Sequence, residues 1–187
     1  MDRVHQDEEQ DWVRRAAAGD RAAFAALVAR YWRPVRAWLY GLCGEFHTAE
    51  DLAQDVFFRA WMGLPKLASA EVFRVWLFRI ARNEYLARQR SPRVGKLAEL
   101  PPEIAGPRAE PLTGLLEKEG ATALDEAVSR LPILFQEAYL LWTNADWPYS
   151  EIARVLETTE ETARWRVCEA RRRLVGELGP LLERTVR

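Results

Sequence analysis

Hydrophobic residues recur at spacings of three and four along most of this 187-residue chain, which is the period of amphipathic helices. The clearest stretch follows a Gly19-Asp20 pair, which supplies a stop signal and an N-cap for a new helix. The inward positions of this stretch are Phe24, Leu27, Val28, Tyr31, Val35, Trp38, Leu39 and Leu42. The pattern therefore predicts a long helix that begins just after Asp20.

Two further helices are predicted in the first half of the chain. One begins at Thr48, because Thr48 and Asp51 have the spacing of a capping box in which Asp replaces the usual Glu. Its inward stripe is Leu52, Val56 and Ala60. The next helix runs from about Val72 to Gln89, with inward positions at Phe73, Trp76, Leu77, Ile80 and Ala81.

The second half of the chain shows the same helical period. A short helix over residues 124–131 is ended or interrupted by Pro132, and another carries Phe135 to Trp142. A third covers residues 150–156, and Thr158 or Thr159 can cap a last helix that runs to about Leu182. The two helices joined at residues 157–159 form a helix-turn-helix candidate. No stretch alternates convincingly with period two, so we expect an all-α protein.

Proline and charge divide the chain into two helical domains. Residues 92–120 contain five of the ten prolines, and residues 97–120 carry five glutamates against Arg108 and Lys118. Helices tolerate such proline spacing poorly, so we predict an acidic, Pro-rich linker over residues 92–120. This linker separates a first domain at residues 10–91 from a second domain at residues 121–187.

The third predicted helix is strongly basic, although the whole chain has a net charge of only -1. Residues 74–96 hold six arginines and one lysine against one acid, Glu84. Aromatic residues lie among them, at Phe73, Trp76, Phe78 and Tyr85. Arginines that follow a backbone and aromatics that stack on bases are typical of single-stranded DNA binding. The alternative is that the arginines form a solvated face and the aromatic residues belong to the core. Trp76 in particular fits this alternative.

Two other helix faces are ambiguous from the residues alone. The helix-turn-helix candidate could place its second helix in a DNA major groove, or it could be an ordinary helical hairpin with a solvated arginine face. The outward face of the second helix combines acids, amides and aromatics, which is typical of a protein-docking surface but also of a solvated face.

Enzyme, metal and membrane functions find little support. The chain lacks the common phosphate-binding, nucleophile-elbow and zinc-protease motifs, so we expect no enzyme activity and no cofactor. Cys43, Cys168, His5 and His47 are too few and too scattered for a metal site. No apolar run approaches the roughly 20 residues that span a bilayer, and the acidic N-terminus is unlike a secretory signal. We therefore expect a cytoplasmic protein with free thiols.

Several segments in order resemble the extracytoplasmic-function (ECF) group of bacterial sigma factors. GDRAAFAALVARYWRPV, AEDLAQDVFFRAW and FRVWLFRIARNEYLARQR resemble motifs of the family's sigma-2 domain. LDEAVSRLPILFQEAYLL and YSEIARVLETTEETARWRVCEARRRL resemble its sigma-4 helix-turn-helix. The resemblance covers roughly residues 16–91 and 122–178, and it implies a sigma factor that binds core RNA polymerase and directs promoter-specific transcription initiation.

The resemblance also assigns roles to residues. The β′ clamp helices of polymerase would dock on Asp51, Gln54, Asp55, Phe58 and Trp61. The -10 element would be bound by Lys66, Leu67, Arg79, Arg82, Asn83, Arg88 and Arg90. The -35 element would be read by Thr159, Thr162, Arg164, Trp165, Arg166, Cys168, Glu169 and Arg171. The β flap of polymerase is an expected contact, and an anti-sigma factor is a candidate partner.

Three departures from the family pattern concern the second domain. Glu157 stands in a turn that usually contains Gly, and Trp165 stands where Ser is usual. Glu169 replaces a common Arg, so it could accept a hydrogen bond from a cytosine N4 while removing a phosphate-binding charge. The rival interpretation is a regulator whose helix-turn-helix binds duplex DNA without polymerase, but such a protein has no need of the motifs at residues 49–90.

Overall fold

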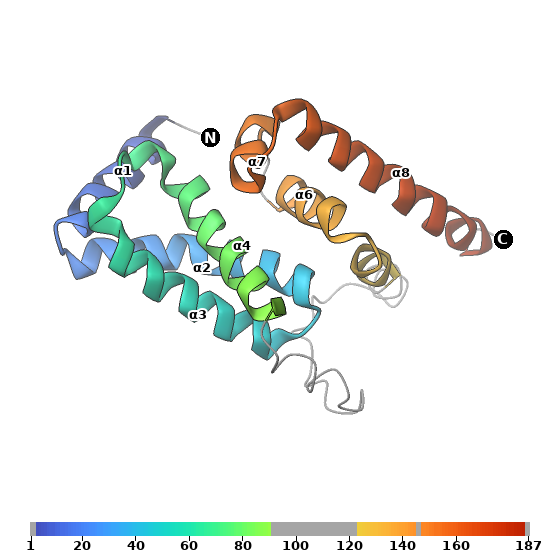
Figure 1. Ribbon diagram of the computed structural model, residues 1–187, viewed down its shortest axis with the longest axis horizontal. Helices are drawn as coiled ribbons and strands as arrows, with labels where there is room; N and C mark the ends of the chain where they lie inside the picture. The colour runs from blue at the N-terminus through green and yellow to red at the C-terminus, as the bar shows by residue number, and fades with distance from the viewer. Residues whose placement is uncertain (1–2, 91–122, 145–146, 186–187) are drawn as a thin grey trace.

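The structure, a computed structural model, describes residues 3–90, 123–144 and 147–185 and contains only helices within these ranges (Figure 1). The first domain consists of α1 (Arg3–Ala17), α2 (Arg21–Cys43), α3 (Phe46–Gly63) and α4 (Phe73–Arg90). Two 3-10 turns, η1 (Leu64–Lys66) and η2 (Ala70–Val72), connect α3 to α4. The second domain has a helix over residues 123–129, then α6 (Ile133–Thr143), α7 (Tyr149–Leu156) and α8 (Glu160–Thr185). The predicted all-α fold with two helical domains is confirmed, and the predicted linker lies outside the described residues.

Helix α2 begins where the sequence predicts. The Asp20 carboxylate accepts hydrogen bonds from the backbone N–H groups of Ala22 at 2.9 Å and Ala23 at 3.1 Å. These two bonds satisfy donors that the first turn of a helix otherwise leaves free. At the other end Gly44 adopts a left-handed conformation with φ of 71°, so the chain leaves the helix and reverses within two residues.

The predicted start of α3 at Thr48 is wrong. The helix begins at Phe46, and the residue that caps it is Glu45. The Glu45 carboxylate accepts from the backbone N–H of His47 at 2.8 Å and of Thr48 at 2.6 Å. Thr48 therefore lies inside the first turn, since the tight reversal at Gly44 brings the helix start forward.

Helix α1 was not among the predicted helices. It buries only a narrow stripe, including Val13 and Ala16, against the rest of the first domain. The Tyr31 hydroxyl of α2 donates a hydrogen bond of 2.8 Å to Glu9 of α1. A stripe this narrow in a polar segment gives a weak periodic signal, which explains why the sequence pattern did not reveal it.

A continuous hydrophobic core extends through both domains. Trp38 of α2 is fully buried, and its ring centroid lies 5.7 Å from that of Phe78 of α4. Phe78 in turn meets Trp147 of the second domain edge-on at 4.9 Å. A smaller cluster joins the helix at 123–129 to α8 through Ala127, Val128, Leu131, Ala170 and Leu174. The two domains are thus packed together, with α4 between α3 and α7 (Figure 1).

Candidate polymerase and nucleic-acid interfaces

The outward side of α3 carries a mixed polar and apolar surface. The helix turns Leu52, Val56 and Ala60 into the core, as predicted. The residues on its opposite side are exposed, and we call this surface the α3 face: Asp51, Gln54, Asp55, Phe58 and Met62. Phe58 is 67% exposed and Met62 is 64% exposed. Apolar anchors inside a polar rim are the usual composition of a protein-docking surface.

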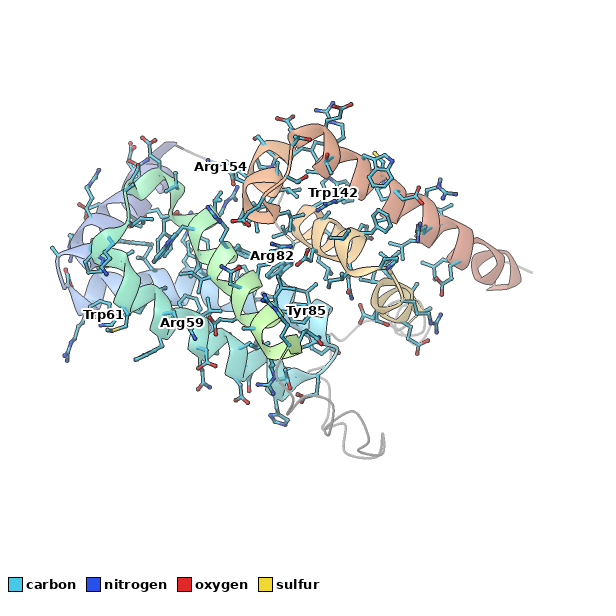
Figure 2. All side chains as sticks on the ribbon, viewed as in Figure 1. Arg59, Trp61, Arg82, Tyr85, Trp142 and Arg154 are labelled. Carbon is cyan, nitrogen blue, oxygen red and sulfur yellow. The ribbon has the colours of Figure 1, made fainter. Side chains whose placement is uncertain are left out.

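The α3 face differs from the predicted docking set at its end. Trp61 is half-buried, because its ring packs against Phe24 with a centroid distance of 4.9 Å. Met62, which the sequence analysis did not single out, is the exposed apolar residue there instead. Met62 lies four residues after Phe58, so its place on the same side of the helix could have been predicted from the sequence. Figure 2 labels Trp61 and its neighbour Arg59, which forms a salt bridge with Glu84 of α4 at 2.6 Å.

The residues expected to bind the -10 element lie on two separate segments. Lys66 is exposed at the end of η1, whereas Leu67 is partly buried against the core. Asn83 is exposed on α4, ten residues after Phe73. Ten helical residues span about 15 Å, so Asn83 lies well away from the start of α4, where η2 ends.

The aromatic residues of α4 do not form a surface on which bases could stack. Phe73, Phe78 and Tyr85 are buried, and Trp76 is half-buried against the core. The Tyr85 hydroxyl donates a 3.2 Å hydrogen bond to the backbone carbonyl of Leu42. The interpretation of these rings as a stacking platform is therefore wrong, and the alternative of an aromatic core is correct. Phe78 and Tyr85 are buried because α4 packs on two sides, against its own domain and against the second.

The arginines of α4 are held by polar partners. Three of them pair with carboxylates of the second domain: Arg74 with Glu151, Arg79 with Glu157, and Arg82 with Glu137. Arg88 donates to the Thr48 hydroxyl at 3.3 Å, and Arg90 donates to the backbone carbonyl of Leu86 at 3.2 Å. Predicted DNA contacts Arg79 and Arg82 thus face the second domain in this structure, and Figure 2 shows Arg82 between α4 and α6.

Glu137 is the most deeply buried charged side chain of this region. It is 1% exposed, and its Oε1 accepts a 2.9 Å hydrogen bond from Arg82. Its other oxygen has no hydrogen-bond partner among the described residues. Burial raises the pKa of the Glu137 carboxyl above its ordinary value, against the opposing influence of Arg82 and Arg166.

The helix-turn-helix consists of α7, a three-residue turn and α8. Thr159 caps α8, because its hydroxyl accepts the backbone N–H of Thr162 at 3.1 Å and shares a hydrogen bond with the Thr162 hydroxyl. Glu157 in the turn has φ of 54°, and it is the one non-glycine residue with positive φ in the described chain. A left-handed conformation is unfavourable for a residue with a Cβ atom.

The first turns of α8 present most of the predicted -35 contacts to solvent. Arg164, Trp165, Cys168 and Arg171 are exposed, and Trp165 is 58% exposed with its ring edge-on to Phe135 at 5.5 Å. Other predicted contacts, Arg166 and Glu169, are partly buried.

Both carboxylate oxygens of Glu169 already serve as acceptors. Arg172 donates to them at 2.7 and 2.8 Å, and Arg173 donates at 2.8 Å. These hydrogen bonds, first from Arg172 and then from Arg173, lower the pKa of Glu169 to about 2. The expected cytosine contact by Glu169 must therefore compete with two arginines of the same helix.

Within the described ranges, no three His, Cys, Asp or Glu side chains gather as a metal site would require. Cys43 and Cys168 are both free thiols. Among the described helices, none is long and apolar enough to cross a membrane.

Comparison with known proteins identifies relatives for both domains. The family model Sigma-70 region 2 matches residues 27–93, and Sigma-70, region 4 matches residues 121–174. The RNA polymerase sigma factor NccH of Alcaligenes xylosoxydans is 30% identical over 89% of this chain and 92% of its own length. The ECF RNA polymerase sigma factor SigW of Bacillus subtilis is 26% identical over 90% and 96%. The sigma factor RpoE of Bartonella quintana, in complex with the anti-sigma factor NepR, is 25% identical with a TM-score of 0.69, covering 83% of this chain and 96% of that one.

Proposed function

This chain belongs to the ECF family of RNA polymerase sigma factors, and we propose that its two helical domains divide promoter recognition between them. The protein is an alternative sigma factor that directs transcription initiation. Its partners are core RNA polymerase and promoter DNA. Its relatives are sigma factors, which are not enzymes, and we propose that it likewise has no catalytic activity and acts in the cytoplasm.

The α3 face is the proposed polymerase-docking surface, and its exposure is the observation that carries this assignment. Asp51, Gln54, Asp55 and Phe58 lie together on one exposed side of a helix whose other side is core. Phe58 can anchor in a partner pocket while the acids and amide pair around it. In the family resemblance, this surface binds the β′ clamp helices.

The first domain binds the -10 element in this proposal. Asn83 is exposed on α4 and can offer both a donor and an acceptor to a base edge. Lys66, Arg88 and Arg90 supply positive charge for the DNA backbone on the same domain, together with Arg79 and Arg82. Extruding a base costs a few kcal/mol, which these contacts and polymerase binding offset. The opened strand is thus favoured by differential binding.

The second domain reads the -35 element through α8. The exposed Arg164, Trp165 and Arg171 lie within the first four turns of α8, the part of a recognition helix that reaches base edges. Thr159 and Thr162 at that start lie near the phosphates in this arrangement. The β flap of polymerase would hold the same domain, and residues 92–120 would connect it to the first.

An anti-sigma factor is a proposed further partner. The structural relative RpoE is bound to one. The apolar part of the α3 face, at Phe58 and Met62, is a surface that such an inhibitor could cover.

The test is run-off transcription by core polymerase and this protein on a randomised promoter library. Asp55→Arg should abolish initiation through lost core binding, whereas Asn83→Ala should weaken initiation with core binding intact. Asp125→Arg is the matched control, because it reverses an exposed acid outside the α3 face and should leave both readouts unchanged. Tight duplex binding without any core binding or initiation would contradict the proposal and leave the polymerase-independent regulator as the better account.

A further inference from the structure

One aromatic ring stands out on the exposed side of α8. Trp165 is 58% exposed and lies between Arg164 and Arg171 along the helix. Both arginines rest against rings of neighbouring helices. The Arg164 guanidinium lies 5.3 Å from the ring centroid of Tyr149, and that of Arg171 lies 5.1 Å from the ring centroid of Trp142, which Figure 2 labels. Trp165 is therefore the largest hydrophobic side chain that the first four turns of α8 expose to solvent.

The Trp165 ring is held in place by Phe135 of α6. The two rings meet edge-on, with their centroids 5.5 Å apart and their planes inclined by 67°. Phe135 is partly buried, because it packs against the small cluster that joins the helix at residues 123–129 to α8. The Arg173 guanidinium lies 4.6 Å from the centroid of the same Phe135 ring. Trp165 thus combines exposure with a defined position, so the ring loses little freedom when it packs against a binding partner.

The hydrogen-bonding residue one turn further along α8 is already engaged. Glu169 follows Trp165 by four residues, but its side chain is only 15% exposed. Its two carboxylate oxygens accept hydrogen bonds from Arg172 and Arg173. A cytosine amino group would have to displace these arginines, whereas an apolar group that packs on Trp165 displaces only water. On this side of α8, apolar contact is therefore the more accessible means of base recognition.

The charges around Trp165 favour DNA over an apolar protein partner. Residues 160–173 contain five arginines and three glutamates. Arg164 and Arg166 flank Trp165 in the sequence, and three consecutive arginines follow at residues 171–173. Two acids precede it at residues 160–161, and the first of them accepts a 3.0 Å hydrogen bond from Arg164. An apolar ring among several arginines suits a groove that is lined by phosphates.

The edges of bases in the major groove carry one apolar group, the 5-methyl group of thymine. We infer that Trp165 is a specificity-determining residue that packs against the methyl group of one thymine in the -35 element, and that Phe135 is its positioning residue. The inference deepens the proposed function and rests on it, because α8 must lie in the major groove for this contact to form. Serine, which is usual at this position of the family pattern, offers no comparable apolar surface.

The test compares thymine with uracil, because deoxyuridine differs from thymidine only by the loss of the 5-methyl group. The protein, assembled with core polymerase, binds the promoter that it selects from the randomised library. Each thymine of the -35 element is replaced by deoxyuridine in turn, and competition binding gives the dissociation constant. At one position the replacement should weaken binding about fourfold, which corresponds to the burial of one methyl group. A -35 element without thymine, or one whose thymines can all be replaced without loss, would overturn the inference.

Trp165→Ala should bind the thymine promoter more weakly and should no longer distinguish thymine from uracil. Val175→Ala is the matched control, because Val175 is a 71% exposed apolar residue on the same helix. It lies ten residues after Trp165, or about 15 Å along the helix, so this variant should keep the fourfold difference. A fourfold difference that persists in Trp165→Ala would overturn the inference, since another residue would then recognise the methyl group.

Phe135→Leu tests the positioning role, because leucine keeps an apolar side chain but removes the ring beside Trp165. The difference between thymine and uracil should fall below about twofold, although Trp165 is still present. A loss of packing alone would weaken binding to both promoters equally, and circular dichroism measures how far the variant is destabilised. A full fourfold difference in Phe135→Leu would overturn the positioning role.

Failure of the thymine contact and failure of the proposed function give different results. A protein that initiates at its selected promoter but is indifferent to uracil contradicts the thymine contact alone. A protein that neither binds core polymerase nor initiates contradicts the proposed function, and it selects no promoter from the library. Weaker binding of Trp165→Ala to core polymerase in the absence of DNA would place Trp165 on a polymerase contact and would also overturn the inference.

Discussion

Glu137 shows how one buried carboxyl at the domain interface can make the stability of the protein depend on pH. Its carboxyl is buried at the interface, with Arg82 of α4 and Arg166 of α8 as its charged neighbours and Tyr85 close by. Burial nevertheless dominates and raises the pKa of this carboxyl. The native protein therefore holds a proton on Glu137 more firmly than the unfolded chain does. The resulting stabilisation is complete below the unfolded pKa and is lost as pH rises through the native one.

The raised pKa of Glu137 leads to a prediction for how the stability of Glu137→Gln depends on pH. Glutamine has the shape of the protonated acid, so the variant lacks the proton that wild type releases. From about pH 4.5 upward, the urea midpoint of wild type should fall relative to that of Glu137→Gln, because only wild type must bury a new charge. Urea unfolding of both proteins from pH 4.5 to 7.5 measures the difference. Parallel profiles would show that the Glu137 carboxyl keeps an ordinary pKa in the native protein.

At the scale of the element, α3 separates a stabilising side from a binding side. Leu52, Val56 and Ala60 are buried, while Phe58 is largely exposed and Trp61 is half-buried against Phe24. Changes on the two sides should therefore affect different measurements.

Phe58→Ala should weaken core polymerase binding by about 2 kcal/mol, or about thirtyfold, as expected for an aromatic anchor. Its effect on thermal stability should be small, since little of its surface is buried in the free protein. Trp61→Ala is the contrasting variant and should lower the melting temperature, because it leaves Phe24 without its aromatic neighbour. Binding by fluorescence polarisation and unfolding by circular dichroism distinguish them. Unchanged core affinity in Phe58→Ala would remove Phe58 from the docking surface.

The turn between α7 and α8 leads to a second prediction, which concerns the stability cost of the left-handed Glu157. Glu157→Gly and Glu157→Ala both lose the ion pair with Arg79, but only glycine relieves the left-handed strain. The glycine variant should therefore unfold with a free energy about 1 kcal/mol above that of the alanine variant. Thermal unfolding of the two proteins measures this difference. An alanine variant as stable as the glycine variant would mean that the turn carries no such strain.

The helices of this protein were predictable to different degrees. Helix α2 has a full apolar stripe and an aspartate cap, so its start at Arg21 follows from the sequence. The start of α3 at Phe46 does not follow from the sequence, because a glutamate cap at Glu45 is less distinctive than the Thr48 capping box. Helix α1 escaped prediction because it buries few apolar residues. On α3 and α8 most of the predicted outward residues are exposed, whereas Trp61, Arg166 and Glu169 are partly buried.

At the scale of the whole molecule, the domain interface could not be predicted. The pairs Arg82–Glu137 and Arg74–Glu151 join helices that are far apart in the chain, and charge pairing across such distances has no periodic signal. The basic helix was visible in the sequence, but its partners were not. The burial of Phe78 and Tyr85 follows from the same docking, since α4 contacts core on two sides. Periodicity describes one helix at a time, whereas these contacts depend on how helices meet.

The paired arginines of α4 have a consequence for how many copies of the protein are free to bind polymerase in the cell. A bacterial chromosome presents about a million or more non-specific sites, and a protein with exposed strand-binding charges is divided among them in proportion to its affinity. A chain that largely covers Arg74 and Arg82 and pairs Arg79 with a glutamate is expected to lose fewer copies to that competition. More of the molecules synthesised then stay available to polymerase, so the output of its promoters should follow the number of copies made more closely than the amount of DNA present.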